Sequence, residues 1–300
     1  MTRLDRSETA PITLAGWYDP LEPTEKRASP DASIITFYGA SHTVRLADAL
    51  GRISDRMAPR IIGAPGATSN WSYGAYLRDR GGGNSRAVQL KQLCDDFVVL
   101  PDDVECRLSY ALYRRSFHLE GNRLEVIHPP YASFDQYVKT FYDPAAWSAA
   151  LRFFVENDPF YDSFVEHANI LDHSALLRLL RRGHDHKMIR DLQKSVLDQS
   201  GFRPDSEGLR VARAIIHEFA MQARRDGMIP IIYLVNNLGY SDNLFRALRP
   251  APEADNVPYL STHTLVSPDD PRGYLPDSHF TDENDNRLAA ALVELIDNGK

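Results

Sequence analysis

Short apolar segments that alternate with amphipathic helical segments place the strongest constraint on the fold of this chain. Residues 34–38 (IITFY) and 229–235 (IPIIYLV) are rich in β-branched and aromatic residues, and Arg60–Ile62 is a shorter segment of the same kind. Such segments, when helices separate them, are typical of strands in a parallel sheet that is covered on both faces. We therefore expect an α/β fold with a doubly wound sheet, whose functional groups gather at the carboxyl ends of the strands.

Three segments have the spacing of apolar residues that is typical of amphipathic helices. The first follows strand 34–38, the second precedes strand 229–235, and the third comes after Thr281, which can cap it. Their apolar residues are, in chain order, Val44, Ala47, Leu50, Ile53 and Met57; Ala212, Ile215, Ile216, Phe219, Ala220 and Ala223; and Leu288, Leu292, Leu295 and Ile296. The segment PDSHF before the last helix is therefore expected to be a loop.

The other segments suggest how the chain is divided. Residues 1–31 contain four prolines among charged residues, which predicts an irregular leader. Residues 32–300 are expected to form one domain, with a third strand at Phe97–Leu100. Residues 105–205 are rich in aromatic side chains, and we expect them to form a large helical insertion that caps the active edge of the sheet. The alternative is that these aromatic side chains pack the core of the insertion itself.

Composition and charge exclude several classes of function. The 34 basic and 41 acidic side chains give a net charge of -7, so the chain lacks the positive field of a nucleic-acid-binding protein. Cys94 and Cys106 do not form a C-x-x-C pair, and we expect no metal and no cofactor. The chain has no run of 18 apolar residues, so no membrane span is expected. The sequence as it stands predicts a cytoplasmic protein, or an extracytoplasmic one if a signal or anchor precedes it.

Ser41, Asp277 and His279 have the residue types and the placement that a nucleophilic serine site requires. Ser41 follows Gly39 in the turn between the first strand and the first helix, where a hydroxyl can project above the sheet. Asp277 and His279 stand two residues apart in the loop before the last helix, so the carboxylate can orient the imidazole. Each signal has a structural alternative: Ser41 can be a helix cap, and the D-x-H segment can be a turn.

Three segments resemble the conserved blocks of the SGNH/GDSL hydrolases. IITFYGASHT is similar to the first block of that family, GAPGAT to the second, and YLPDSHFTDENDNRLAAAL to the last. The resemblance implies a flavodoxin-like three-layer α/β/α sandwich and an esterase or acyltransferase that forms an acyl-enzyme on Ser41, without a cofactor. It also implies a small-molecule or carbohydrate ester as the substrate, with Asp277 and His279 completing the catalytic triad.

The oxyanion site implied by the resemblance is only partly present. The family uses the N–H of the nucleophile, a glycine N–H that Gly66 matches, and an asparagine side chain. Here Asp102 stands where that asparagine is expected, and an ionised carboxylate cannot donate a hydrogen bond. Asn70 is a substitute candidate, and Asn236 and Asn237 are further ones. The family's G-D-S also reads Gly39-Ala40-Ser41 here.

These departures leave a second hypothesis open, namely a binding protein that keeps the fold without the chemistry. Among the other histidines, His263 is a rival base, and His184 and His186 are a weak metal candidate. His42 adjoins the nucleophile, but consecutive helical side chains diverge, so we expect it to be exposed or capping. A nucleotide phosphate loop at GAPGAT is disfavoured because its glycine spacing does not fit the known motifs.

Overall fold

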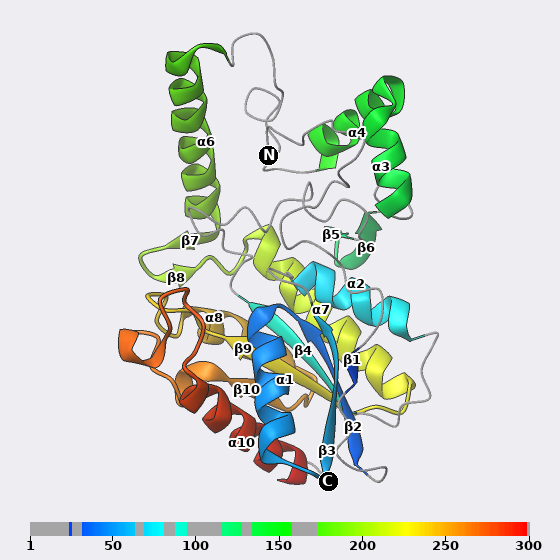
Figure 1. The fold of residues 1–300 in the computed structure, drawn as a ribbon, viewed down its shortest axis with the longest axis vertical. Coiled ribbons are helices and arrows are strands. Elements are labelled where there is room, and N and C mark those ends of the chain that lie inside the picture. Colours follow the sequence, from blue (N-terminus) through cyan, green and yellow to red (C-terminus); the bar gives the residue numbers. More distant parts are fainter. Residues whose placement is uncertain are drawn as a thin grey trace.

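The computed structural model describes residues 24–25, 32–63, 69–80, 88–94, 116–127, 134–157 and 173–298, and it shows a mixed α/β fold (Figure 1). Its largest sheet has six strands in the order β1-β3-β2-β4-β9-β10. Five of them run parallel, and β1 pairs antiparallel with β3 at one edge. The strands are β1 (Thr24–Glu25), β2 (Ser33–Gly39), β3 (Met57–Gly63), β4 (Val88–Cys94), β9 (Pro230–Val235) and β10 (Tyr259–Ser261).

The strands predicted at 34–38, Arg60–Ile62 and 229–235 are confirmed as the cores of β2, β3 and β9. The third strand predicted at Phe97–Leu100 lies outside the described residues and stays a prediction. The position between β2 and β9 is occupied by β4. Its sequence VQLKQLC mixes apolar and polar residues, so a search for wholly apolar segments misses it. The predicted leader contributes Thr24–Glu25 to the sheet as β1, and its other residues up to 31 are not described.

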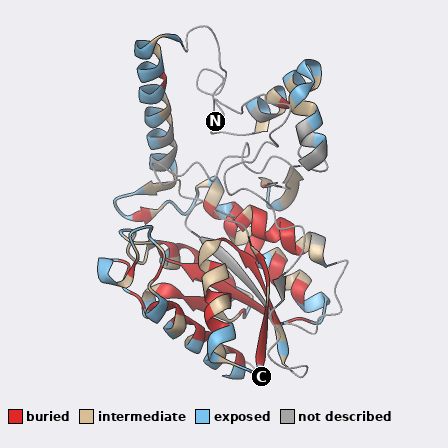
Figure 2. Cartoon of the chain, viewed as in Figure 1, coloured by how far each residue is buried: buried red, intermediate tan, exposed pale blue. Residues whose placement is uncertain are grey.

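Two helices cover each face of this sheet. On one face lie α1 (Ser41–Ile53) and α10 (Asp282–Asn298), which pack on the cluster that contains Leu46, Leu288 and Leu292. On the other face lie α2 (Ser69–Asp79) and α7 (Glu207–Arg225). The buried residues therefore form a layer on each side of the strands (Figure 2).

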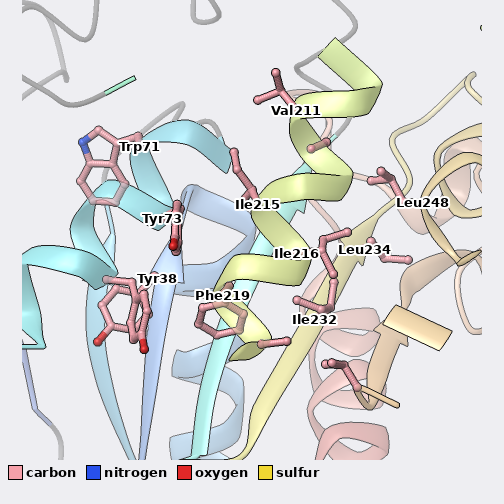
Figure 3. Close-up of a cluster of buried hydrophobic side chains, with 14 of the residues drawn as sticks. Tyr38, Trp71, Tyr73, Val211, Ile215, Ile216, Phe219, Ile232, Leu234 and Leu248 are labelled. Carbon is pink, nitrogen blue, oxygen red and sulfur yellow. The ribbon is translucent and has the colours of Figure 1, made fainter. Parts of the chain in front are cut away.

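The apolar stripe predicted for α7 is confirmed, because all six of its residues are buried. Three of them, Ile215, Ile216 and Phe219, are labelled in the buried cluster of Figure 3. For α1 the prediction is only partly right: Ala47 and Leu50 are buried, but Ile53 is exposed and Met57 is the first residue of β3. Thr281 caps α10 as predicted, since its hydroxyl accepts a hydrogen bond from the backbone N–H of Asn284 at 3.4 Å.

The chain between β4 and α7 contains smaller elements. They are the hairpin of β5 (Ser116–Glu120) and β6 (Arg123–Ile127), the helices α3 (Phe134–Tyr142), α4 (Pro144–Asn157) and α6 (Ala175–Val196), and the pair β7 (Leu197–Asp198) and β8 (Gly201–Phe202). Helices α3, α4 and α6 stand beyond the sheet, on the side at which the parallel strands end (Figure 1). Within the predicted insertion, Phe117 packs on Tyr73 of α2 in the core beside the sheet, and Trp147 packs on Phe141 between α4 and α3.

The short helices α8 (Asn243–Leu248) and α9 (Pro250–Ala254) connect β9 to β10, and the 3-10 helices η5 (Thr262–Thr264) and η6 (Pro271–Gly273) follow β10. The segment from 274 to 281 then leads into α10 and brings its residues back toward the start of α1. Within the described residues, no helix combines the length and the apolar character needed to cross a membrane.

Candidate active site

Ser41 is the first residue of α1 and directly follows the strand β2. The N-cap position belongs to Ala40, which makes no side-chain capping bond, so Ser41 is not the helix cap. Its hydroxyl is instead joined to His279, with 2.7 Å between Oγ and Nε2. The first N–H groups of a helix have no acceptor within the helix and form the positive end of its dipole. Negative charge that develops at Ser41 Oγ is therefore favoured by its position.

His279 and Asp277 lie in a closed turn between η6 and α10. The backbone N–H of Leu275 donates to the carbonyl of His279 at 2.6 Å, and Tyr274 pairs with Phe280 as an isolated bridge. Ser278 adopts a left-handed conformation with φ of 68°, which turns the chain between the two functional residues. As a result, the backbone N–H of His279 donates to Asp277 Oδ1 at 3.2 Å.

The imidazole of His279 bridges the hydroxyl and the carboxylate. Its Nδ1 lies 3.0 Å from Asp277 Oδ2, while its Nε2 faces Ser41. A carboxylate accepts but does not donate, so the proton belongs on Nδ1, and Nε2 is left to accept the proton of Ser41. Both hydrogen bonds from His279 lower the pKa of Asp277, which keeps the carboxylate ionised in mild acid. The side chain of Asp277 is 65% exposed, so water screens its charge.

His42 was expected to be exposed or capping, and the structure shows that this is wrong. Its ring centroid lies 4.9 Å from the ring of His279 and 4.9 Å from that of Phe280. Its Nδ1 is buried and has no hydrogen-bond partner among the described residues. Burial, followed by the neighbouring His279 and Arg45, lowers the pKa of His42 to about 3. The ring therefore acts as a neutral surface against which the imidazole of His279 packs. Consecutive side chains on a helix point in different directions, which separates His42 from Ser41. That geometry does not separate His42 from His279, which lies on another segment.

The predicted oxyanion residues are less fully described. Gly66 and Asp102 lie outside the described residues. Asn70 is the second residue of α2, and its buried Oδ1 has no hydrogen-bond partner in the part of the chain that the structure describes. Asn236 is fixed within the fold, because its amide donates to Ser261 Oγ at 3.0 Å and its Oδ1 accepts from the N–H of Phe245. A donor role for Asn236 is thus disfavoured, since both ends of its side chain are already bonded.

The rival histidines take part in other contacts. Nδ1 of His263 lies 2.8 Å from Ser261 Oγ, its ring packs on Phe245, and burial lowers its pKa. His184 and His186 are exposed on α6. No group of three metal-ligating side chains occurs within the described ranges.

Sequence reasoning missed one further residue that contacts the base loop. Arg45 is four positions after Ser41, on the same face of α1, and its guanidinium donates to the carbonyl of Phe280 at 3.0 Å. It also forms ion pairs of 2.8 Å with Asp282 and with Asp285. The i, i+4 spacing from the nucleophile was the only signal of this role in the sequence.

The arrangement of hydroxyl, imidazole and carboxylate can perform nucleophilic chemistry on a carbonyl carbon. Comparisons with known proteins do not assign it to a family: no protein-family model matches this chain, and no curated protein matches it.

Proposed function

We propose that this protein is a serine esterase or acyltransferase of the SGNH/GDSL type, which acts on short acyl esters of small molecules or carbohydrates. The observation that carries the proposal is the continuous path of hydrogen bonds from Ser41 Oγ through His279 to Asp277, with steps of 2.7 and 3.0 Å. Both distances lie within hydrogen-bond reach, as a nucleophile and its base require.

The sheet supports the finer fold assignment within this proposal. The five parallel strands follow one another along the chain as β2, β3, β4, β9 and β10, and we number them 1 to 5 in that sequence. Across the sheet they then stand in the order 2-1-3-4-5, which is the order of flavodoxin-like sheets. In such sheets the functional site lies at the carboxyl ends of the strands, where Ser41 follows β2. We therefore propose a flavodoxin-like three-layer sandwich that spans residues 32–300, with the insertion at about 105–205 as a cap over this edge.

The chemistry proceeds through an acyl-enzyme. His279 Nε2 takes the proton of Ser41 as Oγ attacks the ester carbonyl, and the N–H groups at the start of α1 stabilise the oxyanion. His279 then gives that proton to the departing alkoxide, which leaves the acyl group on Ser41. An incoming water or sugar hydroxyl loses its proton to His279, attacks the acyl carbonyl, and releases Ser41 as the proton returns to Oγ. Asp277 holds the imidazole in the required tautomer throughout.

The test is covalent labelling by a fluorophosphonate probe, together with hydrolysis of a short-chain aryl ester. We expect the parent to be labelled, and both labelling and turnover to vanish in Ser41→Ala and His279→Ala. Ser54→Ala is a matched serine control, because Ser54 caps the opposite end of α1. His186→Ala on the exposed face of α6 is the histidine control. A folded parent that resists the probe would instead favour a binding protein, the reading suggested by Ala40 and Asp102.

A further inference from the structure

Arg45 connects the helix of the nucleophile to the segment that carries the base. Its three hydrogen bonds reach Phe280, Asp282 and Asp285, at distances from 2.8 to 3.0 Å. The carbonyl of Phe280 belongs to the residue directly after His279, and the two carboxylates belong to the first turn of α10. A guanidinium holds its donors in a rigid plane, so the three acceptors are fixed together relative to α1.

The base loop has a limited set of other attachments to α1. Its internal bonds, such as that from Leu275 N–H to His279 O, stabilise the shape of the turn but do not fix its position. The ring of His42 supplies packing against His279 and Phe280, which is non-directional. The bond between Ser41 and His279 is itself the feature that must be held. Arg45 therefore provides directional contacts between α1 and both the base loop and the first turn of α10, whereas the bond of 3.2 Å from Arg52 to Asn286 joins α1 to α10 further from the base.

The two carboxylates that accept hydrogen bonds from Arg45 differ in burial, so their ion pairs with Arg45 differ in strength. The side chain of Asp282 is 85% exposed, so its ion pair is weak. The side chain of Asp285 is only 1% exposed, and its Oδ1 accepts no hydrogen bond from any residue that the structure describes. Burial raises the pKa of Asp285 to about 6, and the charge of Arg45 opposes that rise. The buried carboxylate thus depends on Arg45 for its only cationic hydrogen bond within the described part of the chain.

We infer that Arg45 is a positioning residue, which sets the distance between Ser41 and His279 by fixing the Phe280 carbonyl and the start of α10 to the nucleophile helix. The inference rests on the proposed function, because it concerns the same serine and histidine. It predicts that loss of the guanidinium slows the attack by Ser41 without weakening the binding of the substrate.

The informative variants separate positioning from stability. Arg45→Met keeps the length of the side chain but leaves Asp285 buried without its cation, which threatens folding. The double variant Arg45→Met/Asp285→Asn removes that charge, while the contact with Phe280 O stays lost. Arg45→Lys retains one charge but cannot reach three acceptors in one plane. Asp282→Asn is the control, because it alters only the ion pair of Arg45 with an exposed carboxylate.

In the folded double variant we expect kcat for the aryl ester and the rate of probe labelling to fall at least tenfold, with KM changed less than about threefold. Arg45→Lys should recover part of the loss, and Asp282→Asn should stay within about threefold of the parent. Parent rates in the folded double variant would overturn the inference. If the parent itself is not labelled, the proposed function fails. In that case ¹⁵N spectra of the imidazole of His279 test separately whether Arg45 positions the ring. Parent-like His279 signals in the double variant would show that Arg45 does not position the ring.

Discussion

Ser41 and His279 are separated by 238 positions in the sequence, yet Oγ of the serine lies 2.7 Å from Nε2 of the histidine. The turn after β2 places the serine at the edge of the sheet, and the packing of α10 beside α1 on one face brings the histidine to the same edge. The arrangement of Ser41 and His279 is thus a product of long-range packing, and it depends on residues outside the site.

Replacement of Asp277 by asparagine tests the role of the carboxylate. An amide in this position can hold the imidazole in the wrong tautomer, in which Nε2 carries the proton and cannot accept that of Ser41. Loss of a buried triad carboxylate costs about 10⁴-fold in kcat. Asp277 is exposed, and solvent screening reduces its influence, so we expect a fall of about 10- to 100-fold.

The measurement for Asp277→Asn is kcat with a short-chain aryl ester at pH 7, with Asp270→Asn as the matched control. Asp270 lies in the same connection after β10, but its partner is Arg272. A variant at Asp277 that turns over as fast as the control would remove the carboxylate from the mechanism.

His42 makes a specific contribution to the dependence of stability on pH. Its pKa is about 3 in the folded protein and about 6.5 in an unfolded chain. Between these values the unfolded chain takes up a proton that the folded protein does not, so acid reduces the free energy of unfolding over this window. His42→Phe retains a ring against His279 and removes the titration.

We therefore expect the unfolding free energy of the parent to decrease relative to that of His42→Phe as the pH falls from 6.5 toward 4, as measured by urea denaturation. Asp285, whose pKa is raised to about 6, acts in the opposite direction over part of this range, but both proteins contain it. Parallel curves for the two proteins would mean that His42 is protonated in the folded state.

The local patterns in the sequence were sufficient for most of the sheet and for the loops that carry Ser41, Asp277 and His279. Wholly apolar strands can be recognised without tertiary information, as β2 and β9 illustrate. The turn at Ser41 and the closing D-x-H could likewise be placed in loops, while their meeting was implied only by the resemblance to the SGNH/GDSL hydrolases. By contrast, β4 lies between two strands but mixes polar with apolar residues, so its central position could not be read from its composition.

The environment of the triad could not be predicted in the same way. His42 was assigned from helical geometry alone, which describes neighbours within α1 but not the loop that packs against it. Arg45 was not singled out, because its three acceptors come from residues 235 to 240 positions away. Such contacts depend on how α10 packs beside α1, and no local sequence pattern determines that packing.

Asp79 joins three elements of the fold and should be important for stability. It accepts a hydrogen bond of 2.6 Å from the buried hydroxyl of Tyr38, and two from the guanidinium of Arg60 at 2.5 and 2.6 Å. Asp79→Ala leaves a mostly buried cation and a buried hydroxyl without this acceptor, so we expect a loss of about 3 kcal/mol in unfolding free energy.

Chemical denaturation at pH 7 measures this loss, with Arg56→Ala as the control. Arg56 forms an exposed ion pair with Asp297, and its removal should cost less than about 1 kcal/mol. Similar losses in the two variants would show that burial of the Asp79 cluster adds nothing to its strength.

Gly63 is the position at which a single methyl group should disturb the nucleophile most directly. It ends β3 opposite Gly39 of β2, and a Cβ there would lie 2.6 Å from Val44 Cγ2 and 3.0 Å from the carbonyl oxygen of Gly39. That carbonyl belongs to the turn that leads into Ser41. Gly63→Ala should therefore cost about 1–3 kcal/mol in stability, as overpacking in a core does, and should also slow labelling of Ser41.

Gly183→Ala is the matched control for this change, because a Cβ at that position in α6 would meet no described residue within 4 Å apart from the backbone of the helix itself. Alanine in a helix interior is favoured over glycine by roughly 0.5–1 kcal/mol, so the control should be neutral or slightly stabilising. Denaturation curves and labelling rates of the two variants, measured together, separate a general effect of alanine from crowding at the turn. If Gly63→Ala matches Gly183→Ala in both readouts, the close approach of β3 to the Gly39 turn does not hold the nucleophile in place.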